Sequence, residues 1–220
     1  MIDRSGVAIG TSSPRRRDAL GIVARIAAWA LAAYALPAGL SSAAAQPASP
    51  AEPIGTLPVS ALARPNVVVL LRHAYAPGVG DPPGFQLQSC STQRNLDASG
   101  RAQAQRLGAA WRAAGFRPGA VWSSAWCRCQ DTARLMGLGP VTVLPLLNSF
   151  FGDAGARTQQ TAALSRFIDQ LDPRGGPYLM VTHQIVITAL TGLGADSGGG
   201  VVFELPLDGR PRRLYRLPAG

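Results

Sequence analysis

The 220-residue chain contains no lysine, and all 21 of its basic residues are arginine. Beyond the N-terminal run Arg15-Arg16-Arg17, these arginines are scattered along the chain and only Arg212-Arg213 approaches a basic cluster, so the net charge of +9 does not indicate a nucleic-acid-binding surface. Charged residues make up only 15% of the chain and hydrophobic residues 47%. This balance excludes an intrinsically disordered protein and predicts one packed domain.

The sequence also lacks an apolar run long enough for a bilayer-spanning helix, which needs about 20 residues. The longest run, residues 26–40, contains Pro37, follows Arg15-Arg16-Arg17 and precedes the small residues SSAAAQ. This order is typical of a secretory signal peptide, and Ala43-Ala44-Ala45 fits an A-x-A cleavage site. Export is therefore favoured over the alternative of a membrane anchor.

We accordingly expect three segments. Residues 1–45 are the signal peptide, residues 46–64 are a flexible linker rich in Pro, Ala and Ser, and residues 65–220 form the folded domain. The mature protein is expected in the periplasm or outside the cell, without stable insertion in a membrane. Arg16-Arg17 loosely resembles a twin-arginine signal, but Ala19 stands where an aromatic residue or Leu is usual, so the export route stays open.

Cysteine and histidine are scarce as well, with three Cys and two His in the chain. Cys127 and Cys129 lack the two-residue spacing that is usual in metal sites, and both histidines are assigned below to another role, so we expect no metal and no cofactor. In an oxidising compartment, the odd number of cysteines predicts one disulfide and one free thiol. We expect Cys90 to pair with either Cys127 or Cys129, and the sequence does not choose between them.

From Asn66 onward, short apolar runs alternate with amphipathic patterns. The β-branched run of residues 67–71 is typical of a strand buried on both faces of a parallel sheet. Further strands are expected near residues 120–123, 141–146 and 178–181, and a final hairpin over 201–205 and 213–217. Helices are expected over residues 98–114, 128–136, around 164–171 and from 185 to 190. The sum predicts a three-layer α/β/α sandwich with a largely parallel central sheet.

The two histidines, His73 and His183, each follow a predicted central strand. Ligands of open α/β sheets bind beyond the carboxyl ends of the strands, so both imidazoles are expected at one edge. Arg72 adjoins His73, and Arg128 begins a helix after the strand end at Ser123-Ser124. A helix that opens after His183 also offers N–H groups to an anion. These features predict a phosphate-binding site; taken singly, each histidine is also compatible with an ordinary strand-end residue.

Three segments carry a family resemblance: VVVLLRHA (67–74), SSAWCRCQDTA (123–133) and VTHQIVITALTG (181–192). They resemble the signatures of the histidine phosphatase superfamily, which has the phosphoglycerate-mutase-like fold, and the resemblance spans about residues 66–217. It implies an exported member of bacterial type in which His73 is the nucleophile. Arg72 and Arg128 would hold the phosphoryl group, and His183 would hydrogen-bond it in the transition state.

The general acid is the main departure from the family pattern. The first branch commonly has a Glu after the third strand, where this chain reads LLNSFFGD (146–153). Asp153 is the nearest carboxyl and becomes the candidate acid, although Asp is also frequent as a turn or cap residue before a helix. Gln184 excludes the Asp that the other branch places directly after its second His. Ala74 and Gln184 replace glycines common in the family, and Gln184 is expected on the pocket wall.

The loop after the first strand, residues 75–95, is long enough to suggest a functional segment. Arg94 and Gln93 are expected to contact the leaving group of the substrate, or, for Arg94, to lie in solvent before the helix. The resulting prediction is an exported, metal-independent phosphatase of small-molecule phosphate monoesters. A non-catalytic phospho-ligand-binding module is the main alternative, and a mutase is a weaker one.

The signal-peptide prediction can be checked directly. Export should remove the N-terminal segment near Ala45, because the apolar run is too short to remain as an anchor and the cleavage pattern follows it. N-terminal sequencing of the exported protein should start at or near Gln46. Recovery of residues 26–40 in washed membranes would contradict the prediction.

Overall fold

The computed structural model describes residues 54–208 and 211–220, so the expected signal peptide lies outside the described residues. Within these ranges, no helix combines the length and apolar character needed to cross a bilayer. The expected start of the domain at residue 65 is too late. Thr56 pairs with Arg216, Val59–Leu62 form the 3₁₀ helix η1, and Leu62 is fully buried. The second half of the expected linker is therefore part of the folded domain.

A six-stranded sheet with the strand order β3-β2-β4-β1-β5-β6 forms the centre of the domain. Its strands are β1 (Val67–Arg72), β2 (Ala120–Ser123), β3 (Val141–Val143), β4 (Tyr178–Thr182), β5 (Gly200–Glu204) and β6 (Arg213–Leu217). The first four strands in this order run parallel, and β5 and β6 are antiparallel to their neighbours. The predicted largely parallel sheet is confirmed. The third strand is shorter than expected, because Pro145 opens the 3₁₀ helix η3 (Pro145–Leu147).

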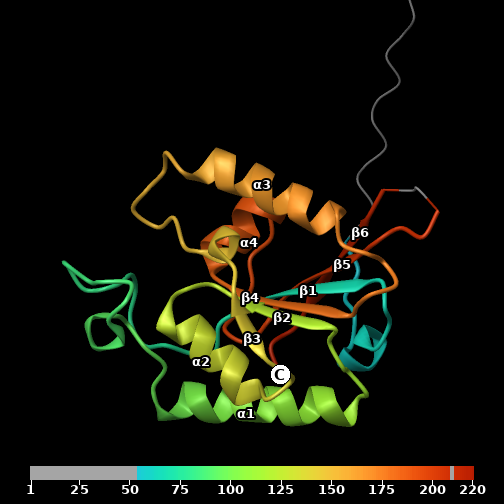
Figure 1. Ribbon diagram of the computed structural model, residues 1–220. Helices are drawn as coiled ribbons and strands as arrows, with labels where there is room; N and C mark the ends of the chain where they lie inside the picture. The colour runs from blue at the N-terminus through green and yellow to red at the C-terminus, as the bar shows by residue number, and fades with distance from the viewer. Residues whose placement is uncertain (1–53, 209–210) are drawn as a thin grey trace, which may run out of the picture. The chain divides into compact units, whose positions relative to one another are not determined.

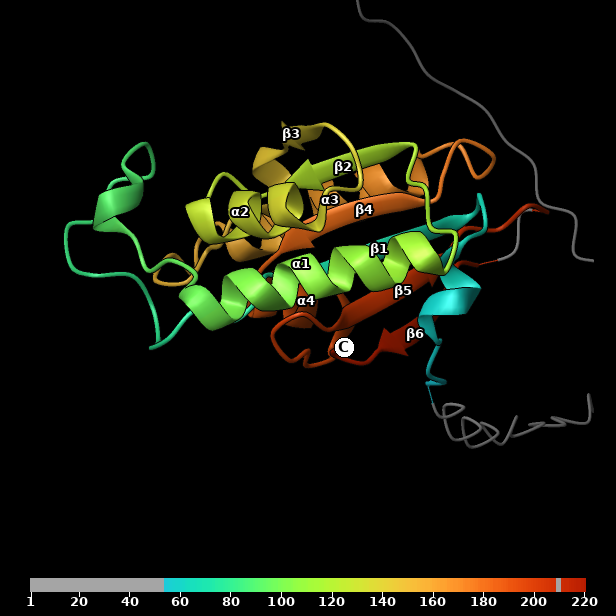
Figure 2. The same cartoon turned by 90° about the horizontal axis from the view of Figure 1, so that it is seen from below.

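Helices cover both faces of this sheet. They are α1 (Ala98–Ala113), α2 (Cys127–Met136), α3 (Arg157–Asp169) and α4 (Gln184–Thr191), with the short 3₁₀ helix η2 (Cys90–Thr92) in the loop after β1. In Figures 1 and 2, α1 and α2 lie on one face of the sheet and α3 and α4 on the other. The predicted α/β/α sandwich is thus confirmed. The bounds of α1, α2 and α4 agree with the expected ones to within one residue, whereas α3 begins at Arg157, well before the expected start near residue 164.

The core consists of two clusters separated by the sheet, and β1 contributes to both. Alternate side chains of this strand point to opposite faces, so Val67, Val69 and Leu71 pack with α1 and α2, whereas Val68 and Leu70 pack with α3 and α4. All five side chains are fully buried. A strand buried on both faces is rigid, and this fixes the position of the residue that follows it.

Two glycines of α1 allow close backbone contacts that a larger residue would block. A Cβ atom at Gly108 would lie 1.9 Å from the carbonyl oxygen of Met136 at the end of α2. A Cβ atom at Gly100 would lie 1.9 Å from the carbonyl oxygen of Tyr75. The first contact seats α2 on α1, and the second brings the start of α1 against the segment that follows β1.

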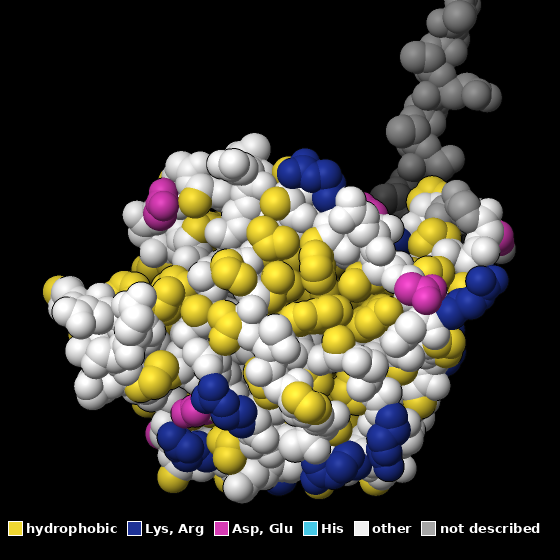
Figure 3. Space-filling view, in the orientation of Figure 1, with side chains coloured by type: hydrophobic (Ala, Val, Ile, Leu, Met, Phe, Trp, Pro, Cys, Tyr) yellow, Lys and Arg dark blue, Asp and Glu magenta, His cyan; other side chains and the backbone are white. Residues whose placement is uncertain are grey.

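The sheet ends in two short edge strands, the three-residue β3 and the five-residue β6. Figure 3 shows the face on which β3 lies, and apolar side chains gather across the middle of this face. Val143 of β3 is 43% exposed. The shortness of β3 limits the length over which another chain could pair with this edge.

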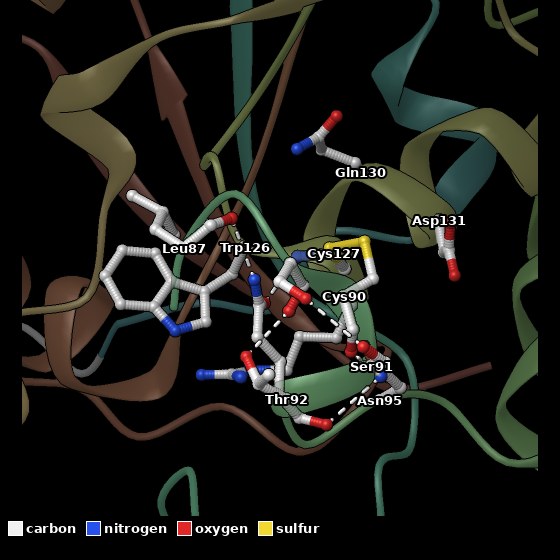
Figure 4. The surroundings of a disulfide bond; sticks show 12 residues. Leu87, Cys90, Ser91, Thr92, Asn95, Trp126, Cys127, Gln130 and Asp131 are labelled. Atoms are coloured by element: carbon white, nitrogen blue, oxygen red, sulfur yellow. Dashed lines mark hydrogen bonds between the residues drawn. A yellow bond between two sulfur atoms is a disulfide. The ribbon is translucent and has the colours of Figure 1, made fainter. Parts of the chain in front are cut away.

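A disulfide joins Cys90 of η2 to Cys127 in the first turn of α2, with a Cα–Cα distance of 5.7 Å (Figure 4). The predicted disulfide from Cys90 is confirmed, and the structure selects Cys127 as its partner. Cys129 is the free, buried thiol. The bond ties the loop between β1 and α1 to the residue immediately before Arg128.

Loss of this disulfide should destabilise the protein. Because the two cysteines are 37 residues apart in the sequence, Cys90→Ser should lower the free energy of unfolding by about 2–4 kcal/mol. Denaturant unfolding checks the value, and a reductant should reproduce the loss in the wild type while leaving Cys90→Ser unchanged. Thiol titration of the unfolded wild type should find one free thiol before reduction and three after it. Three thiols before reduction would contradict the prediction.

Candidate active site

The parallel pairing of β1 with β4 brings the two histidines together. Arg72 and Thr182 are partners at the last position of this pairing, and each is followed directly by a histidine. The ring centroids of His73 and His183 are 5.6 Å apart, with the rings nearly perpendicular. Both residues are buried, at 3% and 4% exposure. The predicted convergence of the two strand-end histidines is therefore present in the structure.

The ring of His73 is held in one orientation by the backbone. Its Nδ1 lies 2.8 Å from the carbonyl oxygen of Ala74. A carbonyl oxygen only accepts, so Nδ1 carries the proton and Nε2 keeps its lone pair. Burial, reinforced by the nearby arginines and opposed by the hydrogen bond to Ala74, lowers the pKa of His73 to about 3. His73 is therefore a neutral imidazole with Nε2 available as a nucleophile.

The ring of His183 takes part in a chain of hydrogen bonds. Nη2 of Arg128 lies 3.3 Å from Nδ1 of His183, so Nδ1 accepts and Nε2–H donates to Oγ of Ser124 over 2.8 Å. Ser124 in turn donates to Oδ1 of Asn148, which also accepts from the backbone N–H of Ala125. Burial and the neighbouring Arg128 lower the pKa of His183 well below its usual value. Ser124 and Asn148 thus orient this ring, a role not inferred from the sequence.

The two predicted arginines flank the histidine pair. Arg72 donates from Nη1 to the carbonyl oxygen of Ala195, and burial lowers its pKa. Arg128 is only 3% exposed. The Nε–H groups of both arginines are buried and have no hydrogen-bond partner among the described residues. Such unpaired donors are uncommon inside proteins, and here they leave both side chains with a free donor beside the histidines.

Asp81 is an acidic residue of this site that sequence reasoning missed. Its carboxylate accepts from Nη1 of Arg128 at 2.7 Å and from Nη2 at 3.2 Å, and its side chain is 8% exposed. It also accepts from the backbone N–H of Arg94 and from the indole N–H of Trp126. Burial opposes ionisation, but the hydrogen bonds from Arg128 and Arg94 outweigh it and lower the pKa of Asp81. The only sequence signal was an acidic residue inside the long loop.

Two residues expected to contact the leaving group have other contacts. Arg94 lines the cavity, but its Nε–H and Nη1–H groups donate to the carbonyl oxygens of Gly80 and Ala76 and so hold the loop that carries Asp81. Gln93 is buried, does not line the cavity, and accepts from the backbone N–H of Cys127. Gln93 therefore joins the loop to α2 and lies outside the cavity wall.

Gln184 lies on the cavity wall, as expected, and its side chain bonds to Thr188 and to the backbone N–H of Ala195. Asp153, the candidate acid, is exposed and does not line the cavity. Its carboxylate accepts from the backbone N–H of Ala156 just before α3. The structure thus places Asp153 in the turn before a helix and away from the histidine pair, because the chain turns outward after Phe150.

A cavity of about 410 Å³ opens over the four predicted residues Arg72, His73, Arg128 and His183. The rest of its wall is formed by Gly78, Val79, Gly80, Asp81, Arg94, Ser149, Phe151, Gln184, Ile185 and Thr188. Val79 and Phe151 are 90% and 65% exposed, so the mouth of the cavity is apolar while its floor is cationic. Among the described residues, no group of three or more His, Cys, Asp or Glu side chains is arranged to hold a metal ion.

The comparisons agree with this geometry. The family model of the histidine phosphatase superfamily (branch 1) matches residues 68–166. A search of curated proteins gives no match. The chain is similar to the structure of mycobacterial glucosyl-3-phosphoglycerate phosphatase with VO3, with 18% identity, a TM-score of 0.52, and coverage of 70% of this chain and 100% of that one.

A second similar structure is phosphoserine phosphatase from Entamoeba histolytica in complex with 3-phosphoglyceric acid. It has 11% identity and a TM-score of 0.52, and the match covers 70% of this chain and 97% of that one. At these identities the likeness establishes the fold, while the family model accounts for the segment from β1 to α3. Residues 68–166 are thus similar to the histidine phosphatase superfamily, branch 1, and the described domain shares the α/β fold of these solved phosphatases.

Proposed function

We propose that this protein is an exported phosphatase that hydrolyses small-molecule phosphate monoesters through a phosphohistidine on His73. Phosphate esters are the typical substrates of the family, whose hydrolases typically work without a metal ion. The observation that carries the proposal is the fixed tautomer of His73, because its Nδ1–H bond to Ala74 leaves Nε2 unprotonated in a cavity that Arg72, Arg94 and Arg128 also line. Export rests on the N-terminal sequence alone.

The chemistry divides into two displacements. Nε2 of His73 attacks phosphorus, and the bond from phosphorus to the leaving oxygen breaks. Water then attacks the phosphorus of the phosphohistidine, the N–P bond breaks, and its electron pair returns to Nε2. Arg72 and Arg128 would hold the phosphoryl oxygens in both steps. An anionic phosphoryl group beside His183 favours the protonated form of that ring, which then donates from both nitrogens.

The second candidate is a non-catalytic module that binds phosphorylated ligands. It is favoured by one observation: the family's usual Glu is replaced by the LLNSFFGD segment, and Asp153 of that segment does not line the cavity. Turnover of an aryl phosphate by the purified protein separates the two candidates, because a binding module keeps phosphate affinity without turnover.

The different roles of the two histidines predict different losses of activity when each is replaced by alanine. His73→Ala should abolish turnover while phosphate or vanadate binding is partly kept, because the arginines remain. His183→Ala should leave slow activity, reduced by about 10²–10³, because it removes one charge-stabilising group. An acid-labile, base-stable phosphate should be trapped on the wild type during turnover and should map to His73 by peptide mass spectrometry. An active enzyme without this adduct, or full activity of His73→Ala, would contradict the proposal.

The low pKa of His73 also predicts how stability depends on pH. An unfolded histidine titrates near 6.5, whereas His73 in the folded protein has a pKa of about 3. Below about pH 6.5 the unfolded chain therefore binds a proton that the folded chain does not, and the free energy of unfolding falls as the pH falls. From about pH 7.5 to about pH 5, His73 alone should account for a loss of roughly 2 kcal/mol.

Urea unfolding of the wild type and of His73→Asn at both pH values measures this contribution, since asparagine does not titrate. The variant should lose less stability on acidification than the wild type. Equal losses in the two proteins would mean that His73 is charged, or exposed, in the folded state.

A further inference from the structure

We propose that Asp81 is the proton donor to the leaving group, and that the incoming phosphoryl group releases it from Arg128. This inference rests on the proposed function, since it assigns a residue to the acid step that the proposed reaction requires. Asp81 is the only carboxyl group among the residues that line the cavity above His73 and His183. It comes from the loop after β1, far in the sequence from the segment where the family commonly carries its acid.

The hydrogen bonds of Arg128 show why Asp81 must move. A guanidinium has five N–H donors, two on each Nη atom and one on Nε. Nη1 donates to Asp81 and to the carbonyl oxygen of Arg94, and Nη2 donates to Asp81 and to His183. Within residues 54–208 and 211–220, only Nε–H is left without a partner. A phosphoryl group can therefore receive both arms of the Arg128 fork only if it takes the place of the Asp81 carboxylate.

The carboxylate thus occupies, in the free protein, the position that a phosphoryl group needs on Arg128. Both are anions with oxygens that match the guanidinium fork, and a phosphoryl dianion carries the larger charge. Once displaced, Asp81 loses the hydrogen bonds from Arg128 that lower its pKa and lies next to an anion. Both changes favour protonation of the carboxyl group.

The loop has the backbone needed for this movement. Gly78, Gly80 and Gly84 have φ values of 85°, 71° and 73°, a region that glycine adopts without strain, and they bracket Asp81 on both sides. The two bonds from Arg94 to Ala76 and Gly80 hold the loop at its N-terminal side. A shift of Asp81 away from Arg128 therefore takes place next to an anchor at Gly80, and it also releases the bonds that Asp81 accepts from Trp126 and from the backbone N–H of Arg94.

The proton balance of the reaction is complete with these groups. The monoanionic form of the ester or the solvent supplies the proton that the displaced Asp81 takes up, since the second pKa of a phosphate ester is near 6. As Nε2 of His73 bonds to phosphorus, this proton passes to the leaving oxygen and the alcohol departs. The Asp81 carboxylate then accepts a proton from the water that attacks phosphohistidine, and the N–P bond breaks.

The test compares two aryl esters that differ in their need for a proton. Phenyl phosphate has a poor leaving group and 4-nitrophenyl phosphate an activated one. Asp81→Asn keeps the size of the side chain but cannot donate as an acid, so kcat/KM should fall about 10²-fold or more for phenyl phosphate and less than about 10-fold for 4-nitrophenyl phosphate. Competitive inhibition by inorganic phosphate should become tighter, because the competing charge on Arg128 is gone.

Two further variants complete the design. Asp131→Asn is the matched control, since Asp131 is paired with Arg101 and Arg134 on the surface and does not line the cavity; it should leave both esters unaffected. Asp153→Asn tests the rival acid. Three outcomes would overturn the inference while leaving phospho-His73 intact. The first is an equal loss of kcat/KM for the two esters in Asp81→Asn, and the second is weaker inhibition of that variant by phosphate. The third is a larger loss for phenyl phosphate in Asp153→Asn instead of in Asp81→Asn. Failure of the wild type to hydrolyse either ester would remove the proposed function, and this inference with it.

Discussion

The parallel pairing of β1 with β4 is the constraint on which the site depends. Its last register position, Arg72 opposite Thr182, places the two following histidines side by side. β4 also pairs with β2, and Val181 lies opposite Ser123, so Ser124 ends up within hydrogen-bond distance of His183. Three neighbouring strands therefore deliver a nucleophile candidate, a charge-stabilising ring and its orienting hydroxyl. A shift of one residue between β1 and β4 would turn the side chains to the opposite faces of the sheet and separate these groups.

The elements and the histidine pair could be predicted from the sequence because their signals are local. The β-branched run before His73 and the apolar stripe of α1 specify a buried strand and an amphipathic helix without reference to the rest of the chain. The carboxyl ends of parallel strands lie at the same edge of a sheet, and this rule is enough to predict that the histidines that follow two such strands lie close together. The limits of β3 and of the domain start were missed, because they depend on Pro145 and on the pairing of Thr56 with Arg216.

The carboxyl group at the site could not be predicted, because its position depends on contacts between distant residues. Asp153 was favoured by its place after the third strand, but the chain turns outward there and the side chain caps a turn. Asp81 reaches the histidines only because Arg94 holds the preceding loop and Trp126 and Arg128 bind its carboxylate. A loop rich in glycine and proline has no hydrophobic periodicity from which the position of Asp81 could be predicted. Part of the cavity wall is formed by the same loop.

The disulfide has a consequence for where the protein can work. Cys127 adjoins Arg128, and Cys90 lies in the loop whose residues Gln93 and Arg94 contact α2 and Asp81. The covalent bond therefore joins the loop after β1 to the start of α2, and in a reducing compartment only noncovalent contacts, among them the ion pair of Asp81 with Arg128, would hold the two together. A chain that is made in the cytosol and exported would complete its cavity after translocation, when the thiols become oxidised. Under the proposed export, the joint between the loop and α2 would become covalent only in the compartment where the mature protein resides.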